Sequence, residues 1–332
     1  MAGFSGAAPL SGEFEGRSPS PVSPERTVHM NGFLIANKPT GCTSSNIVVF
    51  VRKRLPRGTT VGHGGTLDPE ASGVLPVCVG SAARLFDYII DKKKTYVARI
   101  KLGEETDTQD ATGQVVKTLP VTVGEEELKA VLPQFEGEIE QIPPMYSALK
   151  RDGERLYKLA RKGETIELEP RKCRVDGVEY LGNEGDNTYL LRIHCGKGVY
   201  IRTLCHDIGR KLGCGAHMKT LERTAAGIFT LENALTQDEI DRLFREGRLE
   251  EALLPLDAPL EHIPRIDVSG DRVRHAVKNG NPLKKNWIHD EIPEGADAVR
   301  IYLEGVFAGI GQPQADGTVK FKAMLYPGEA KA

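Results

Sequence analysis

The chain has 332 residues, and its 44 basic residues nearly balance its 46 acidic ones. At roughly 100–200 residues per domain this length predicts about two domains, and the ordinary composition excludes collagen-like, coiled-coil and wholly disordered proteins. No apolar stretch approaches the ~20 residues of a membrane helix. The N-terminus has no basic-then-apolar signal, so we expect a cytoplasmic protein without a membrane partner.

Order is expected to begin at Gly32. Residues 1–29 are rich in Gly, Ser, Pro and Ala, which predicts a disordered tail. A short buried strand is predicted at 33–36. Ser44 or Ser45 is expected to cap an amphipathic helix that ends at Leu55.

The next segments combine a glycine-rich loop with an alternating strand. We expect the loop at 61–69 and the strand at 95–102. Tyr96 and Arg99 fall on opposite faces of that strand because its side chains alternate. A helix with an acidic first turn is predicted at 124–131.

Two strands at 173–181 and 189–195 are predicted to form a hairpin, because turn-forming residues separate them. The turn at 196–198 then leads into a helix that runs to about Leu212. The pattern Thr-x-x-Glu at 236–239 is a capping box that opens another helix.

The C-terminal part has a different pattern. From about 266 to 326 the sequence alternates short strands with turns, as expected of a small β-barrel. Strands, helices and hairpins are interspersed before it. The fold class that follows is α+β, with a β-rich C-terminal module.

Charges are segregated along the chain even though the net charge is only −2. Seven basic and two acidic residues lie within 192–223, and five basic residues lie within 272–285. The segment 125–140 holds six Glu and one Lys. Such segregation predicts a basic face on a neutral protein, and solvated helix faces are the equal alternative.

Several motifs with well-understood chemistry are missing. The sequence has no phosphate loop, dinucleotide fingerprint, H-E-x-x-H or G-x-S-x-G, so ATP, NAD and serine-hydrolase chemistry lack support. Cys214 and His217, with Cys205 and His206, could supply metal ligands. Free cysteine is more often a small buried residue, so we expect no metal and no cofactor.

The most unusual segment, residues 62–75, contains Asp68 directly before Pro69. Glycine permits close approach of the backbone to a ligand, and the proline favours an extended geometry at Asp68. Such a loop can present one carboxylate to a substrate. The alternative is an Asx-type turn that only closes a surface loop.

This segment resembles the catalytic motif G-H-x-G-x-L-D-P-x-A-x-G-x-L of the TruB family of pseudouridine synthases. Four other segments resemble family motifs in the same order, and the similarity covers about residues 31–328. They are Asn37–Ser45, Lys94–Tyr96, Gln141–Lys150 and Cys195–Thr203.

The resemblance implies a pseudouridine synthase fold, with a central, mainly antiparallel mixed sheet flanked by helices. It also implies a small C-terminal PUA-like β-barrel. We expect a tail at 1–29, a catalytic domain at 30–262 and a PUA-like RNA-binding domain at 263–332. An RNA-gripping insertion is expected at about 144–165.

The implied reaction converts one uridine of RNA to pseudouridine. The base is flipped out, its glycosidic bond breaks, and a carbon–carbon bond forms at C5. In bacterial members the target is uridine 55 of the tRNA T loop. The resemblance implies tRNA as partner and no cofactor, and we expect a monomer without an obligatory protein partner. A covalent ester, a base adduct and a glycal route remain open.

Three residues match the family's catalytic set. Asp68 corresponds to the catalytic aspartate, a nucleophile whose charge also stabilises the cationic sugar. Arg202 corresponds to the arginine that pairs with it, with the geometry for a bidentate contact. Tyr96 corresponds to the tyrosine that stacks on the flipped uracil, and it is a candidate for proton transfer at C5.

A second group is expected to bind the substrate or to brace the catalytic loop. Its members are His63, Tyr200, Leu221, Lys38, Arg223 and Lys150. His63 would fill the space left by the flipped base, whereas Lys38 and Pro39 would brace the loop. Glu222 is a departure from the family, which usually has arginine there. In the insertion, Lys150, Arg151, Arg155, Lys158, Arg161 and Lys162 would contact phosphates.

The sequence is compatible with three functions. The first is a stand-alone tRNA pseudouridine synthase. The second is a guide-RNA-dependent catalytic subunit that resembles the dyskerin-type relatives. The third is a tRNA-folding chaperone in which catalysis is secondary.

Overall fold

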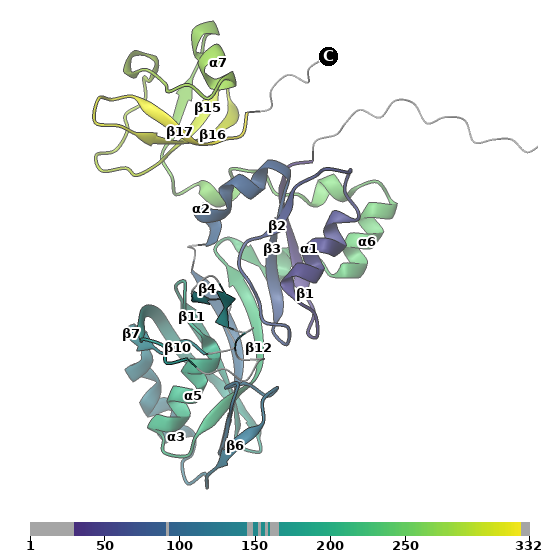
Figure 1. The fold of residues 1–332 in the computed structure, drawn as a ribbon, viewed down its shortest axis with the longest axis vertical. Helices are drawn as coiled ribbons and strands as arrows, with labels where there is room; N and C mark the ends of the chain where they lie inside the picture. The colour runs from purple at the N-terminus through teal and green to yellow at the C-terminus, as the bar shows by residue number, and fades with distance from the viewer. Residues whose placement is uncertain are drawn as a thin grey trace, which may run out of the picture.

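The computed structural model describes residues 30–90, 93–144, 149–151, 154–156, 159 and 166–326. Figure 1 shows an elongated molecule in which a small C-terminal sheet domain sits at one end of a larger α+β body. Within the described residues, no helix is long and apolar enough to cross a membrane.

A mixed sheet runs through the larger body, in the order β1-β3-β12-β4-β11-β10-β7, with β2 on β3 and β13 on β12. Its neighbours pair antiparallel except for β12 and β3, which are parallel, as expected of a mainly antiparallel mixed sheet. Its strands are β1 (Gly32–Lys38), β2 (Val61–His63), β3 (Ser72–Val79), β4 (Lys94–Leu102), β7 (Gly137–Gln141), β10 (Arg171–Gly185), β11 (Thr188–Cys195), β12 (Ala216–Ala226) and β13 (Phe229–Thr230).

Helices and short hairpins complete the body. The helices are α1 (Ser44–Arg52), α2 (Phe86–Ile90), α3 (Glu125–Val131), α5 (Ile201–Lys211) and α6 (Gln237–Arg245). The 3-10 turns are η1 (Gly80–Leu85), η2 (Leu132–Phe135), η3 (Leu231–Asn233), η4 (Leu249–Ala252) and η5 (Ala258–Leu260). The two-stranded pieces are β5 (Glu104–Thr106) with β6 (Val115–Thr118), and β8 (Lys150–Arg151) with β9 (Glu154–Arg155).

Helix starts follow their capping residues. The predicted capping box opens α6, where Thr236 accepts from the N–H of Glu239 at 3.3 Å. The predicted cap of α1 was wrong by one residue: Thr43 caps the helix. Ser44 is instead buried and bonded to the loop before β3. A hydroxyl this close to the helix start can serve either role, and tertiary packing decides between them.

The hairpin between β10 and β11 is tighter than predicted. The strands extend to Gly185 and resume at Thr188, so only Asp186 and Asn187 form the turn. Both have φ near +50° (48° and 50°), the conformation of a two-residue I′ turn that suits the twist of paired strands.

Three apolar clusters hold the body together, and two of them pack its longer helices against the sheet. Helices α3 and α5 cover one face of the sheet and pack with Leu191 and Ile193 of β11 and with Ile100 of β4. Helices α1 and α6 pack against β1 and β3 in a separate cluster. The region where β3 meets β12 joins these two clusters and carries the candidate site.

The C-terminal domain is a four-stranded sheet in the order β14-β15-β16-β17. Its elements are β14 (Arg265–Val268), α7 (Asp271–Lys278), η6 (Lys285–Trp287), β15 (Val299–Leu303), β16 (Val306–Pro313) and β17 (Val319–Met324). Its described strands form an open sheet with β14 and β17 at the edges, not a closed barrel. The sequence predicted only short strands and turns for this region, so helix α7 was not expected. The domain is tied to the body where Arg84 of η1 donates to the Met324 carbonyl at 2.6 Å.

Candidate active site

The loop between β2 and β3 presents Asp68. On one side, the N–H of Leu67 donates to the Ser44 hydroxyl at 2.9 Å, and that hydroxyl donates back to the Leu67 carbonyl at 3.1 Å. On the other side, the Pro69 carbonyl accepts from the Lys38 ammonium at 2.9 Å. The backbone around Asp68 is thus fixed, while 40% of its side chain stays exposed.

Arg202 joins two carboxylates. Its Nη2 lies 3.0 Å from Oδ2 of Asp68, and its Nη1 lies 3.4 Å from Oδ2 of Asp110. The arginine side chain is only 6% exposed and comes from the first turn of α5. The guanidinium therefore reaches two acids, one with each terminal nitrogen.

Asp110 was missed by the sequence analysis. It lies between β5 and β6, where its Oδ1 accepts from the Thr108 hydroxyl at 2.7 Å and from the Thr112 N–H at 3.0 Å. Thr, Asp and Gly around it are ordinary turn formers, so the local sequence signals a turn and nothing more. The link to Arg202, 92 residues further on, exists only in the folded chain.

The surroundings of Asp68 act on its proton affinity in opposing directions. Burial raises the pKa of the carboxyl, while Arg202 opposes that rise. Asp110 raises the pKa further, and Lys38 lowers it. A carboxylate that is partly desolvated but held beside a guanidinium has the properties of a nucleophile or of a stabiliser of developing positive charge.

Tyr96 lies in β4 at the centre of the sheet, where it is paired with Arg223 of β12 and with Ile193 of β11. It is 8% exposed and belongs to the same apolar cluster as Leu67 and Leu221. Burial raises the pKa of the phenol, against the charge and hydrogen bond of Arg223. The structure therefore brings Tyr96 and Leu221 together with the Asp68 loop.

Arg223 lies beneath the loop, not on a surface open to RNA. It is 1% exposed, and its guanidinium donates to the carbonyls of Val74 at 2.7 Å and Gly65 at 3.2 Å. A Cβ on Gly73 would lie 2.2 Å from the Arg223 carbonyl, and Gly73 has φ +102°. The close approach of β3 to β12 therefore requires glycine there.

Lys38 is fully buried, and its hydrogen bonds in the described chain all go to backbone carbonyls. Its ammonium donates to the carbonyls of Pro39, Cys42 and Pro69 at 2.6–2.9 Å. Burial lowers its pKa. The contact to Pro69 links the end of β1 to the loop that carries Asp68.

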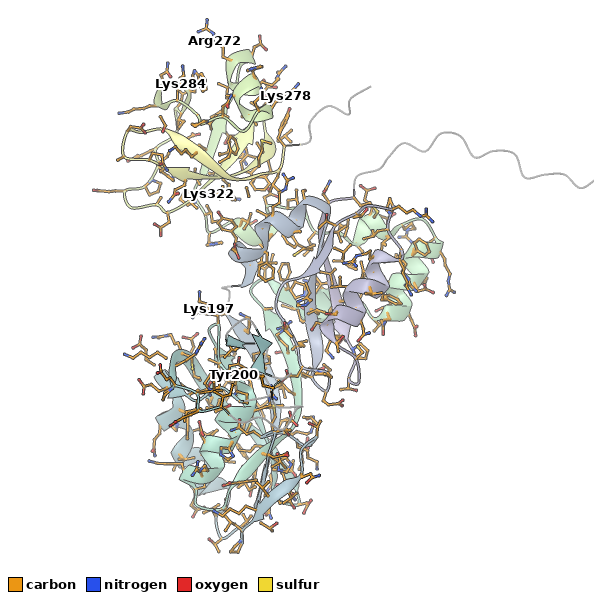
Figure 2. The ribbon with its side chains drawn as sticks, viewed as in Figure 1. Lys197, Tyr200, Arg272, Lys278, Lys284 and Lys322 are labelled. Carbon is orange, nitrogen blue, oxygen red and sulfur yellow. The ribbon has the colours of Figure 1, made fainter. Side chains whose placement is uncertain are left out.

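His63 and Tyr200 flank this centre. His63 ends β2, and its Nδ1 is buried without a hydrogen-bond partner in the described part of the chain. Burial and the charge of Arg223 lower its pKa, so the imidazole is neutral at pH 7. Tyr200 is the half-buried N-cap residue of α5, on the face of the body that also carries Lys197 (Figure 2).

The predicted insertion falls largely outside the described residues. Lys150 is placed only as part of β8, and its side chain lies outside the description. The side chains of Arg151 in β8 and Arg155 in β9 also lie outside the description, and the expected phosphate contacts Lys158, Arg161 and Lys162 lie outside the described residues.

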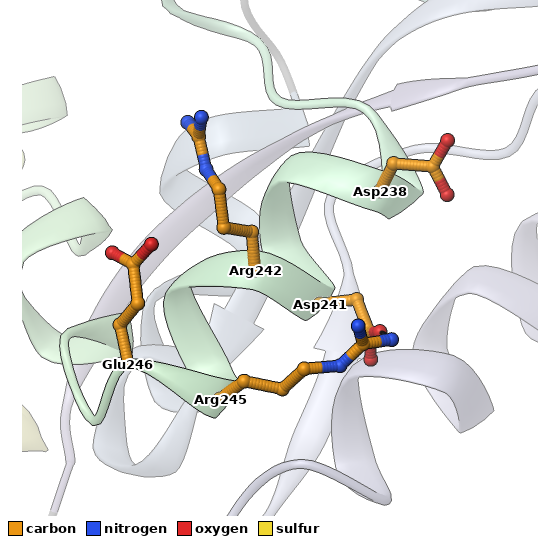
Figure 3. A pocket seen from close by; sticks show the side chains of 5 residues that line it. All are labelled: Asp238, Asp241, Arg242, Arg245 and Glu246. Atoms are coloured by element: carbon orange, nitrogen blue, oxygen red, sulfur yellow. Dashed lines mark hydrogen bonds and ion pairs between the residues drawn. The ribbon is translucent and has the colours of Figure 1, made fainter.

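A surface hollow of about 380 Å³ lies far along the chain from Asp68, on α6 (Figure 3). Its walls are the charged side chains of Asp238, Asp241, Arg242, Arg245 and Glu246. Asp241 already pairs with Arg245 and with Arg54, in the turn after α1. We assign no function to it. The described residues contain no group of three acidic, His or Cys side chains placed to hold a metal ion.

Comparison with known proteins decides the family. The N-terminal domain model of the TruB family pseudouridylate synthases matches residues 53–201, and the C-terminal domain model of tRNA pseudouridylate synthase B matches residues 202–261. The chain belongs to the TruB family. It is 42% identical over 305 residues to tRNA pseudouridine synthase B of Stutzerimonas stutzeri, covering 89% of this chain and 96% of that protein. For the Staphylococcus haemolyticus protein of the same name the values are 41%, 89% and 99%.

Comparison with solved structures shows similarity of the fold as well. A Cbf5-Nop10-Gar1 complex contains a chain with TM-score 0.65 and 30% identity, covering 87% of this chain and 79% of that one. An H/ACA RNP bound to a substrate RNA gives TM-score 0.67 and 28% identity, covering 90% and 86%. The pseudouridine synthase fold expected from the sequence is confirmed.

The departure from the TruB pattern at Glu222 lies away from the site. Leu221 and Arg223 are buried on one face of β12, whereas Glu222 is half-buried and acts electrostatically on Arg99 of β4. Arg99 points to the opposite face of the sheet from Tyr96. Glu222 therefore adds no negative charge beside Asp68.

Proposed function

We propose that this protein is a stand-alone tRNA pseudouridine synthase that isomerises uridine 55 of the T loop. The observation that carries the proposal is the pairing of Asp68 with Arg202 at 3.0 Å beside the buried ring of Tyr96. Relatives named tRNA pseudouridine synthase B match nearly their whole length to this chain. The guide-RNA alternative is less favoured, because the Cbf5 neighbours are less similar in sequence.

The proposed reaction is balanced within the substrate. The bond between N1 and C1′ of the uridine breaks, the uracil turns, and C5 bonds to C1′. C5 loses a proton and N1 gains one, so no oxidant or other reactant is consumed. Asp68 stabilises the positive charge that develops at C1′ or bonds to the substrate directly, and Arg202 keeps it ionised.

Tyr96 and His63 are proposed to handle the flipped nucleotide. The raised pKa of Tyr96 keeps its phenol protonated at neutral pH, and its ring offers an apolar surface for stacking. His63, whose pKa is lowered by burial, can stack in the space that the base leaves. Tyr200 and Leu221 would line the pocket.

Buried Lys38 and Arg223 are proposed to support the catalytic loop and not to touch RNA. Lys150 and the insertion would contact phosphates. We propose a catalytic domain at 30–262 and a PUA-like RNA-binding domain at 263–332. We further propose that the protein acts in the cytoplasm as a monomer without an obligatory protein partner.

The test uses purified protein alone and a T-arm stem-loop labelled with tritium at uracil C5. Release of tritium is expected, because C5 must lose its hydrogen. No release from protein that binds full-length tRNA would contradict stand-alone catalysis. Adding RNA and protein from a cell extract would then separate a guide-dependent enzyme from a folding chaperone.

A further inference from the structure

The first turn of α5 carries Arg202, but its own N-cap residue does not secure it. Tyr200 occupies the N-cap position, and its side chain makes no capping hydrogen bond. Helix ends leave backbone groups that other partners must satisfy. Two glutamines from distant segments supply contacts to this turn, one on each side of Arg202.

Gln141, the last residue of β7, holds the residue before the helix. Its Oε1 accepts from the Tyr200 N–H at 3.0 Å, and its Nε2 donates to the Tyr200 carbonyl at 3.2 Å. That carbonyl also accepts the first helical bond, from Leu204, at 3.0 Å. Gln141 is 3% exposed and paired with Arg171 of β10, so the anchor is part of the sheet.

Gln109 holds the residue after Arg202. The Thr203 hydroxyl donates to Oε1 of Gln109 at 2.8 Å, and Thr203 is 2% exposed. Gln109 has φ +63°, which is unfavourable for a side chain of its kind. The backbone keeps this conformation because the Gln109 carbonyl accepts from the Met218 N–H of β12 at 3.0 Å.

We propose that Gln141 and Gln109 are positioning residues that clamp the first turn of α5, so that Arg202 stays between Asp68 and Asp110. The inference rests on the proposed function for its catalytic consequence. Neither glutamine touches Asp68 in the described structure. Both act through Arg202, since a helix turn fixed at 200 and 203 leaves residue 202 little freedom.

The Gln109 segment has a second link to the same centre. Oδ2 of Asp110, the next residue, lies 3.4 Å from Nη1 of Arg202. Strained backbone that the surrounding structure holds in place is common at functional sites. The turn at Gln109 therefore aligns one anchor of the helix and one carboxylate of the ion-pair network.

The main test is a set of four variants. Thr203→Val removes the hydroxyl at nearly constant volume, and Thr203→Ser restores it. Gln109→Asn keeps an amide that tolerates positive φ but is too short to reach, and Gln141→Leu removes both contacts to Tyr200. A displacement of ~1 Å costs about 10²-fold in rate. We expect single-turnover tritium release to fall roughly 10- to 100-fold in all but Thr203→Ser, with T-arm affinity unchanged.

The pKa of Asp68, followed by carbon NMR in the free protein and assigned with Asp68→Asn, gives a second readout. Asp68 faces three charges, Arg202, Asp110 and Lys38, and substitutions at Thr203 and Gln141 act on the helix turn that carries Arg202. Withdrawal of Arg202 should raise the pKa of Asp68 in Thr203→Val and Gln141→Leu. The double variant Gln109→Asn/Thr203→Val should be no slower than either single one.

Leu128→Ala, in the core of α3, serves as a control for lost stability alone. The clamp is contradicted if the folded variants keep the wild-type rate, or if they slow no more than Leu128→Ala while the pKa of Asp68 stays unchanged. If Gln141→Leu fails to fold, the two Thr203 variants decide. If the wild type releases no tritium, the proposed function fails, and the pKa of Asp68 still tests the clamp.

Discussion

The larger body and the C-terminal domain differ in where their positive charges lie. Around Asp68 the cations of Lys38, Arg202 and Arg223 are buried. In the C-terminal domain several basic side chains, such as Arg272 and Lys284, are exposed. Figure 2 shows several of these projecting from the surface of that domain.

The difference concerns the free-energy cost of burying a cation, which arises in the larger body. A buried cation is costly unless every donor finds a partner, and these three contact backbone carbonyls and two carboxylates. Exposed cations carry no such cost and supply salt-dependent affinity for phosphates. Substitutions should therefore have large effects in the body and small ones in the C-terminal domain.

The largest effect is expected from Asp68→Asn. The amide keeps the shape of the side chain but removes the charge on which the reaction depends. Single-turnover tritium release should fall by at least about 10⁴-fold. Affinity for tRNA should stay within about twofold, because binding is spread over many phosphate contacts. Substantial residual turnover would remove Asp68 from its proposed role.

Arg223→Met tests the buried support of the loop. The substitution leaves the carbonyls of Val74 and Gly65 without their donor. We expect a loss of about 3 kcal/mol in the free energy of unfolding, measured in urea, and a large loss of turnover. Arg242→Met, on the exposed surface of α6, is the matched control and should change stability by less than ~0.5 kcal/mol. Equal effects of both substitutions would contradict the comparison.

Asp110→Asn tests the second carboxylate. The substitution removes the charge that lies 3.4 Å from Nη1 of Arg202, so the guanidinium is less firmly aligned. Turnover should fall roughly 10- to 100-fold while tRNA affinity is unchanged. Asp316→Asn, in an exposed turn of the C-terminal domain, is the control. A rate equal to that of the wild type would show that Asp110 only closes its own turn.

The pH dependence follows from the direction of the Asp68 shift. Burial raises the pKa of Asp68 above its ordinary value of 3.8, so turnover should be lost at a higher pH than for an exposed aspartate. The folded protein then binds this proton more tightly than the unfolded chain. The stability of the wild type relative to Asp68→Asn should therefore decrease as pH rises from below 3.8 through the raised pKa. Urea unfolding of both proteins at several pH values measures it, and an opposite slope would contradict the shift.

The smallest effect is expected in the C-terminal domain. Lys322→Glu and Arg272→Glu each reverse one exposed charge. Either should weaken full-length tRNA binding by only about two- to tenfold and lower its salt dependence. Turnover of the isolated T-arm stem-loop should be unchanged. A loss of T-arm turnover would show that this domain takes part in the catalytic site.

Local signals account for what the sequence could predict. The capping box at Thr236, the strand around Tyr96 and the helix that carries Arg202 depend on nearby residues, and they were predicted correctly. Strand β2 was taken for loop because its three residues are too short for a periodic pattern. Helix α7 was missed because its charged residues read as a basic run in a β-rich region.

The site was predicted only as far as motifs reach. The resemblance singled out Asp68 and Arg202, which the structure joins. It placed Arg223 with the RNA-binding residues, although the fold buries this guanidinium under the loop. Asp110 and Gln141 carry no local sign of their contacts, because each partner lies more than 50 residues away (92 and 59). Long-range pairing in the sheet creates these contacts.

Under the proposed function, Asp68 and Arg202 support the isomerisation of one uridine of tRNA without help from another macromolecule. The most direct measurement incubates full-length tRNA transcript with purified wild-type protein or Asp68→Asn and maps pseudouridine by chemical derivatisation and primer extension. We predict one modified position, uridine 55 of the T loop, with the wild type and none with Asp68→Asn. Absence of modification by folded, tRNA-binding wild type, or equal modification by both proteins, would contradict the claim.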